Sequence, residues 1–177
     1  MERIRSQLGF HNLFVVESIG KSGGLALLWG EDENVEIQNF SQNHINVVVK
    51  TSSNDIAWKL MGFYGQLDVG KCHETWSLLK ALASFSPTPW VCLGDFNEIL
   101  SLLEKWGGSE KSRTQMYAFQ QTLEECELSD LGFVGPKYTW KNCRDGMDFI
   151  RERLDGGLQT KNGETCSFRQ FYMWSLH

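Results

Sequence analysis

The sequence contains few prolines and no long apolar run. Only three prolines occur among its 177 residues, at positions 87, 89 and 136, and they do not form a proline-rich linker. No window of about 18 apolar residues is present, and the N-terminal "MERIRSQLGF" lacks the continuous apolar segment of a signal peptide. We therefore expect no signal peptide and no membrane span, and an intracellular protein of the nucleus or the cytoplasm.

Paired cysteine motifs are also lacking. The five cysteines, at positions 72, 92, 126, 143 and 166, are an odd number and include no C-x-x-C pair. This pattern argues against a disulfide framework and against a zinc knuckle. We expect free thiols in a reducing compartment.

Positive charge is scarce. The chain has 17 Lys and Arg residues against 22 Asp and Glu residues, which gives a net charge of -5 and a pI near 5.4. Proteins that hold nucleic acid mainly by a basic field displace counterions from phosphates with Lys and Arg, so this composition argues against that mode of binding. An acidic protein that recruits a divalent cation stays possible, because the ion brings positive charge with it.

What the sequence does contain is enough apolar residues for one globular domain. Its hydrophobic content is 41%, and a chain of this length buries roughly two thirds of its unfolded surface. Between residues 13 and 65, short runs rich in β-branched and aromatic residues alternate with Gly, Asp, Asn and Ser. Such a rapid succession of short runs is typical of antiparallel strands.

Helical patterns follow these strands. Residues 71–85 place apolar side chains at helical spacing before "SPTP" forbids continuation, and "WVCLGD" at 90–95 reads as a strand. A second helix is predicted from Ser112, where "SRTQ" matches a capping box. After Asp155 the apolar residues follow no clear helical or strand period. The sequence therefore predicts an α+β fold, with helices lying on a sheet.

The buried strand at 90–95 ends on Asp95, and Asn97 follows two residues later. Past the end of a strand, a carboxylate and an amide at this spacing can point into one crevice. There the carboxylate can take a proton or touch a metal ion, and the amide can donate to an oxyanion. The alternative is that both side chains only shape the exit turn. These residues alone leave both interpretations open.

Four motifs in order resemble a known superfamily. They are "GFYG" at 62–65, "GDFNEIL" at 94–100, "YTWKN" at 138–142 and "RERLD" at 151–155. The set resembles the endonuclease/exonuclease/phosphatase (DNase I-like) superfamily, which includes DNase I and the apurinic/apyrimidinic endonucleases. It is most similar to the endonuclease domain of plant LINE-type (non-LTR) retroelements.

This resemblance implies a fold and a set of roles. The fold is a four-layer sandwich of two mostly antiparallel sheets flanked by helices, with the active site at one end. Asp95 would activate the attacking water and touch a Mg2+ or Mn2+ ion, Asn97 would stabilise the pentacovalent phosphate, and Tyr64 would contact a phosphate oxygen. Asp155 would orient a catalytic histidine, and Trp140 would line the substrate cleft. The implied partner is DNA.

The resemblance covers about residues 1–155 and is incomplete. The Asn and the metal-binding Glu of the family's first strands, and the Ser-Asp-His motif of its last strand, have no counterpart in this sequence. We therefore expect a monomeric, partial domain over residues 1–155, a divergent tail over 156–177, and little or no nuclease activity. Two alternatives stay open: a non-catalytic binding module, and a phosphoesterase acting on a lipid or inositol phosphate.

The remaining notable side chains have structural interpretations. Three histidines at unrelated spacings are expected on the surface: His11, His44 and His73. Four tryptophans are expected as core aromatics, although the cleft position stays possible for the last: Trp29, Trp76, Trp90 and Trp140. Glu98 is expected to be a surface charge.

Overall fold

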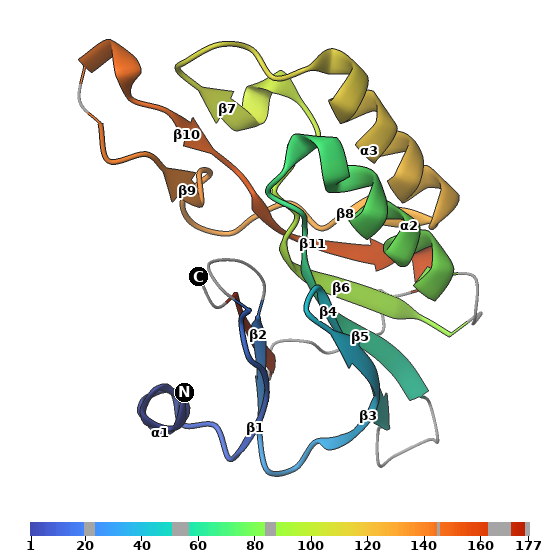
Figure 1. Ribbon diagram of the computed structural model, residues 1–177. Helices are drawn as coiled ribbons and strands as arrows, with labels where there is room; N and C mark the ends of the chain where they lie inside the picture. The colour runs from blue at the N-terminus through green and yellow to red at the C-terminus, as the bar shows by residue number, and fades with distance from the viewer. Residues whose placement is uncertain (20–23, 51–56, 84–87, 145, 163–170, 176–177) are drawn as a thin grey trace.

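A six-stranded sheet lies at the centre of this computed structural model, which describes residues 1–177 except 20–23, 51–56, 84–87, 145, 163–170 and 176–177 (Figure 1). Its strand order is β3-β4-β5-β6-β11-β8. The strands are β3 (Asn34–Ser41), β4 (His44–Lys50), β5 (Ala57–Tyr64), β6 (Trp90–Asp95), β8 (Leu128–Asp130) and β11 (Asp155–Thr160). Only β5 and β6 run parallel; the other neighbours are antiparallel. As a parallel pair requires, β5 and β6 are joined by a long crossover, which contains α2 (Cys72–Ala83).

Two three-stranded sheets accompany the central one. The first has the order β1-β2-β12 and consists of β1 (Asn12–Val16), β2 (Leu25–Trp29) and β12 (Phe171–Ser175). The second has the order β7-β10-β9 and consists of β7 (Lys105–Trp106), β9 (Trp140–Lys141) and β10 (Arg151–Glu152). Both are antiparallel throughout.

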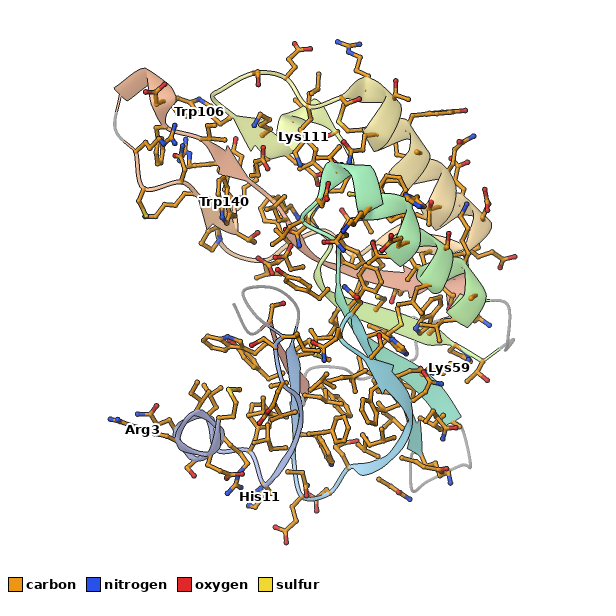
Figure 2. The ribbon with its side chains drawn as sticks, viewed as in Figure 1. Arg3, His11, Lys59, Trp106, Lys111 and Trp140 are labelled. Atoms are coloured by element: carbon orange, nitrogen blue, oxygen red, sulfur yellow. The ribbon has the colours of Figure 1, made fainter. Side chains whose placement is uncertain are left out.

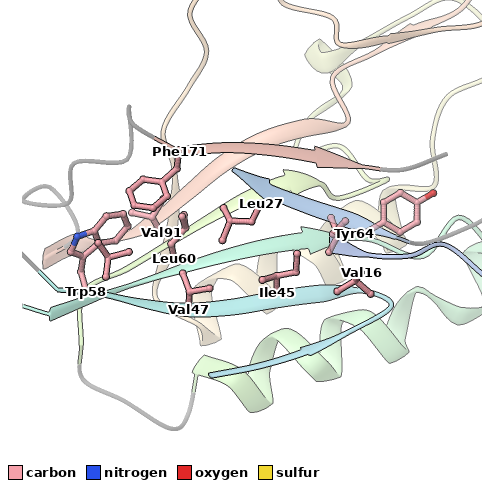
Figure 3. Packing of buried hydrophobic residues seen from close by; sticks show 11 residues of the cluster. Val16, Leu27, Ile45, Val47, Trp58, Leu60, Tyr64, Val91 and Phe171 are labelled. Carbon is pink, nitrogen blue, oxygen red and sulfur yellow. The ribbon is translucent and has the colours of Figure 1, made fainter. Parts of the chain in front are cut away.

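The central sheet buries apolar side chains on both of its faces. One face packs against the β1-β2-β12 sheet, and Figure 3 shows this cluster, in which Leu27 of β2 and Phe171 of β12 meet Leu60 and Val91 of the central sheet. The other face packs under α2 and α3 (Arg113–Glu125), with Phe119 and Leu123 of α3 against Cys92 of β6. Alternate residues of β6 therefore face opposite layers, as the pleat of a strand requires.

The helices complete the layers. Figure 1 shows α2 and α3 side by side over one face of the central sheet, while α1 (Glu2–Leu8) lies beyond β1 on the other side. Ser112 caps α3 as the capping-box pattern predicts, since its side chain accepts a hydrogen bond from the backbone N–H of Gln115. The described residues also form the short 3-10 helices η1 (Val69–Lys71), η2 (Leu102–Glu104) and η3 (Gly146–Asp148). No helix in the described ranges is both long and apolar enough to cross a membrane. The arrangement is the α+β sandwich that the sequence predicts.

The stretch after Asp155 contains regular structure that the sequence pattern did not predict. β11 begins at Asp155 and pairs with β6 on one side and β8 on the other, and β12 pairs with β2 along its whole length. The predicted domain boundary after residue 155 thus falls at the first residue of β11. Residues beyond it contribute strands to the central sheet and to the β1-β2-β12 sheet.

The expectations that His44 lies on the surface and that Trp140 is a core aromatic were wrong. His44 is buried, with 5% of its surface exposed, because its ring nitrogens are hydrogen-bonded within the β3–β4 hairpin rather than to water. His11 and His73 are exposed as expected. Trp90 is a core residue, but Trp140 is 43% exposed, because the two-residue strand β9 lies at the edge of its sheet.

Candidate functional site

Three of the predicted site residues lie at one level of the central sheet. Tyr64 is the register partner of Asp95 across the parallel β5–β6 pair, and Asp155 is the partner of Asp95 across the antiparallel β6–β11 pair. Register partners project from the same face of a sheet. Because Val91 and Leu93 of the same strand pack in the inter-sheet core, Asp95 and its partners face the β1-β2-β12 sheet, at one end of the sandwich.

The three side chains differ in exposure. Tyr64 is 2% exposed, and Figure 3 shows its ring at one end of the inter-sheet cluster, with its hydroxyl directed away from the other labelled residues. Asp95 is 8% exposed, whereas Asp155 is exposed. Asp95 and Asp155 are register partners on neighbouring strands, so two carboxylate residues share one level of the sheet.

Two motif glycines allow the ends of β5 and β6 to approach each other. Gly94 has φ 151, and a Cβ at this position would overlap the carbonyl oxygen of Phe63. A Cβ on Gly65 would overlap the carbonyl oxygen of Phe96. The backbone N–H of Gly65 donates to the carbonyl oxygen of Asp95 at 2.7 Å. The glycines of "GFYG" and "GDFN" therefore have a steric role beside the polar groups.

Asn97 is held in the left-handed region by two hydrogen bonds. Its φ is 54, its backbone N–H donates to Asp95 Oδ1 at 2.9 Å, and its Nδ2 donates to the carbonyl oxygen of Gly65 at 2.8 Å. The exit turn is thus shaped by these side chains, as one of the two interpretations proposed. An amide nitrogen carries two N–H groups, however, so Asn97 can hold the turn and still donate to a ligand.

Thr139 links the "YTW" and "RERLD" motifs, and the sequence did not single it out. Its Oγ1 accepts hydrogen bonds from the backbone N–H groups of Leu154 and Asp155, both at 3.0 Å. The carbonyl oxygen of Leu154 in turn accepts from Phe96 N–H at 2.9 Å. The backbone of Leu154 is therefore hydrogen-bonded both to Phe96 and to Thr139, which precedes Trp140. Its position inside the "YTW" motif is the sequence feature that could have identified Thr139 as a site residue.

Glu98 is buried, which corrects the expectation of a surface charge. Only 3% of it is exposed, and its Oε1 accepts from Ile99 N–H at 2.9 Å and lies 3.6 Å from Lys111 Nζ. Lys111 also lies 3.7 Å from Glu152, which pairs with Lys105. Lys105 and Lys111 thus offset the negative charges of Glu98 and Glu152. Glu98 follows Asn97 directly in the chain. Sequence reasoning missed this because the partners are separated from Glu98 along the chain.

Arg153 joins the segments that surround the start of β11. Its guanidinium donates to both carboxylate oxygens of Asp130 at 2.8 Å, to Glu104 at 2.6 Å, and to the carbonyl oxygen of Gly132 at 2.8 Å. Burial alone raises the pKa of Asp130, but the hydrogen bonds and charge of Arg153 outweigh it, so the pKa is lowered. The same contacts, that with Asp130 first, raise the pKa of Arg153 despite desolvation.

The two strand-end carboxylates, Asp95 and Asp155, have the chemistry to bind a cation that a ligand also coordinates. A Mg2+ ion usually takes one or two protein carboxylates and completes its shell with water and phosphate oxygens, and Asp95 and Asp155 fit that pattern. Within the described ranges, no three His, Cys, Asp or Glu side chains gather closely enough to hold a metal ion.

A separate cavity of about 350 Å³ lies at the opposite end of β6. It is lined by residues that include Lys59, Trp90 and Thr160. Figure 2 shows Lys59 far from Trp140, which lies on the side of the strand-end site. The cavity is therefore not part of that site.

No protein-family model matches this chain, and no curated protein matches it in sequence. Solved structures match it in fold. The endonuclease domain of TRAS1, a telomere-specific non-LTR retrotransposon, has a TM-score of 0.62 and 20% identity, covering 86% of this chain and 69% of that chain. The human Nocturnin catalytic domain has a TM-score of 0.55 and 14% identity, covering 90% of this chain and 64% of that one.

TDP2 from C. elegans is a third match, with a TM-score of 0.51 and 11% identity over 90% of this chain and 50% of its own. The chain thus spans between 50% and 69% of the length of these three structures. At these identities the likeness concerns the fold, and it agrees with the sandwich described above. This chain therefore has a DNase I-like fold.

Proposed function

We propose that this chain is a DNA phosphodiester-binding domain derived from a metal-dependent endonuclease of a plant LINE-type retroelement, and that its turnover is weak. The observation that carries the proposal is the placement of Tyr64, Asp95 and Asp155 at one level of three adjacent strands, with Asn97 fixed beside them. Groups from distant segments that meet at one strand end are the usual composition of a site.

Each side chain has a role that its position permits. Asp95 accepts a proton from an attacking water, and Asn97 donates its second N–H to a non-bridging phosphate oxygen. The Tyr64 hydroxyl contacts a phosphate oxygen at the end of the sandwich, and exposed Trp140 packs against the substrate. Asp95 and Asp155 would hold a Mg2+ or Mn2+ ion, which would supply the positive charge that this acidic chain lacks.

The retroelement origin rests on two observations. The four ordered motifs resemble those of plant LINE-type endonucleases, and a solved endonuclease domain of a non-LTR retrotransposon shares the fold over 86% of this chain. Weak turnover is supported by the donor set: among the described residues, no group of three or more His, Cys, Asp or Glu side chains could hold a metal ion. Loss of one transition-state stabiliser commonly costs about 100 to 1000-fold in rate.

Binding is tested by the anisotropy of a labelled DNA duplex. We expect Mg2+ to strengthen binding relative to EDTA, because the cation offsets repulsion between the carboxylates and the phosphate. Asp95→Asn and Asp155→Asn should each reduce this Mg2+-dependent gain by about tenfold, as loss of a metal-supporting group does. Asp32→Asn is the matched control, since it removes an exposed carboxylate from the turn between β2 and β3. Equal effects of all three variants, or no gain with Mg2+, would contradict the proposal.

Turnover is tested by nicking of supercoiled plasmid with purified protein in Mg2+ and in Mn2+. We expect cleavage near background, with Asp95→Ala alongside as the reference for contaminating nuclease. Robust cleavage that disappears in Asp95→Ala would show that the donor set is sufficient for catalysis, and that the proposed impairment is wrong.

A further inference from the structure

The turn between β3 and β4 touches the end of β5 through Asn43. The β4–β5 ladder ends with the pair His44 and Phe63. One step further, Tyr64 N–H donates to the carbonyl oxygen of Asn43 at 2.8 Å, and Asn43 Nδ2 donates to the carbonyl oxygen of Tyr64 at 2.8 Å. The hydrogen-bond ladder thus continues for one more residue pair, Asn43 and Tyr64. In this pair the side-chain amide of Asn43 donates in place of its backbone N–H.

The side chain is needed because the backbone N–H of Asn43 is engaged inside the turn. It donates to Ser41 Oγ at 3.2 Å, and Ser41 Oγ lies 2.7 Å from His44 Nδ1. His44 Nε2 lies 2.8 Å from Asn39 Oδ1. An amide oxygen only accepts, so Nε2 carries a proton and Nδ1 of the neutral ring accepts from the Ser41 hydroxyl. Burial lowers the pKa of His44, which favours this neutral form.

The segment that Asn43 holds also supports Asn97 and Asp95. Gly65 follows Tyr64 directly; its N–H donates to Asp95 O at 2.7 Å, and its carbonyl oxygen accepts from Asn97 Nδ2 at 2.8 Å. Successive carbonyl oxygens, of Tyr64 and Gly65, are therefore bound by two asparagine side chains from different parts of the chain. A shift of the β5 end would move the acceptor that fixes the amide plane of Asn97.

We propose that Asn43 is a positioning residue for the strand-end site: it fixes the backbone of Tyr64 and Gly65, and through Gly65 it fixes the orientation of Asn97. The inference rests on the proposed function, because it assigns to Asn43 the support of a phosphate-binding amide. Asn43 itself touches no substrate. Its removal leaves the carbonyl oxygen of Tyr64 without its amide donor and allows the β5 end to shift.

The first measurement needs no DNA. In NMR spectra of the full chain, Asn43→Ala should shift the side-chain amide signals of Asn97, because its acceptor Gly65 O moves. Asn39→Ala is the matched control: it is an Asn to Ala change in the same hairpin, and it removes a hydrogen bond to His44 rather than one to Tyr64. It should leave those signals in place. Unchanged Asn97 signals in Asn43→Ala, or equal shifts in both variants, would overturn the inference.

The second measurement is a double-mutant cycle on DNA affinity in Mg2+. Asn43→Ala should weaken binding about fivefold, the value of one hydrogen bond, and Asn39→Ala by less than about twofold. In an Asn97→Ala background the Asn43→Ala effect should shrink, because the part that acts through Asn97 is lost and only the part that acts through Tyr64 stays. Additive effects would overturn the inference. If Asn97→Ala binds as the wild type does, the proposed function fails while the NMR result still decides the role of Asn43.

Discussion

At the scale of single residues, the strand-end site depends on glycines as much as on polar groups. Gly65 and Gly94 let two strand ends approach more closely than any residue with a Cβ allows. The sequence placed Asp95 and Asn97 beyond a buried strand, since an apolar run followed by polar residues is a local pattern. It did not reveal that Glu98 and His44 are buried, because their hydrogen-bond and ion-pair partners depend on the folded chain.

Gly94→Ala tests the steric requirement. Gly94 combines φ 151 with a Cβ position that overlaps the carbonyl oxygen of Phe63, so both backbone strain and displacement oppose alanine. We expect the free energy of unfolding, measured by urea denaturation, to fall by about 3 kcal/mol or more. Gly9→Ala is the control, because Gly9 has φ 76 but nothing within 4 Å of the added Cβ. Its cost should be about 1 kcal/mol. Equal losses in the two variants would contradict the close approach.

At the scale of elements, β11 shows where sequence reasoning stopped. Its residues "DGGLQT" include two glycines and no alternation, and the strand forms because β6 and β8 pair with it on both sides. β12 likewise depends on β2, which lies more than 140 positions earlier in the chain. By contrast, α3 was predicted with its N-cap, because its capping box and apolar stripe are both local.

The contact between β8 and the start of β11 predicts a pH dependence of stability. Arg153 lowers the pKa of Asp130 from its usual 3.8, so the pair stabilises the fold above that value and loses its effect as the pH falls below it. Asp130→Asn should lower the free energy of unfolding by about 2 kcal/mol at pH 7, the range of a charge-assisted hydrogen bond. The difference from wild type should shrink below pH 3.8.

Urea denaturation at pH 7 and at pH 3 measures this difference. Glu36→Gln, which breaks the exposed pair with Lys50, is the control and should change stability little at either pH. A constant difference between wild type and Asp130→Asn at both pH values would show that the Asp130 charge does not contribute.

At the scale of the whole molecule, the proposed DNA binding differs from that of a basic protein, because this chain is acidic. Its net charge is -5, so in the proposed function few phosphates would be neutralised by Lys and Arg, and a cation held by Asp95 and Asp155 would supply the main positive charge. We expect a shallow dependence of DNA affinity on NaCl concentration, with a slope of log K against log salt smaller in magnitude than about 3. A slope near that of a strongly basic binder would indicate that an unrecognised basic surface carries the binding.

The central claim is that a divalent cation and a DNA phosphate meet at the ends of β5, β6 and β11. The most direct test is the broadening of backbone NMR signals by paramagnetic Mn2+ in the presence of a short DNA duplex. The site predicts that broadening centres on Gly65, Phe96 and Asp155, and that it weakens in Asp155→Asn. Broadening centred elsewhere, such as on the turn at Asp32 or beside Lys59, would contradict the assignment of the site.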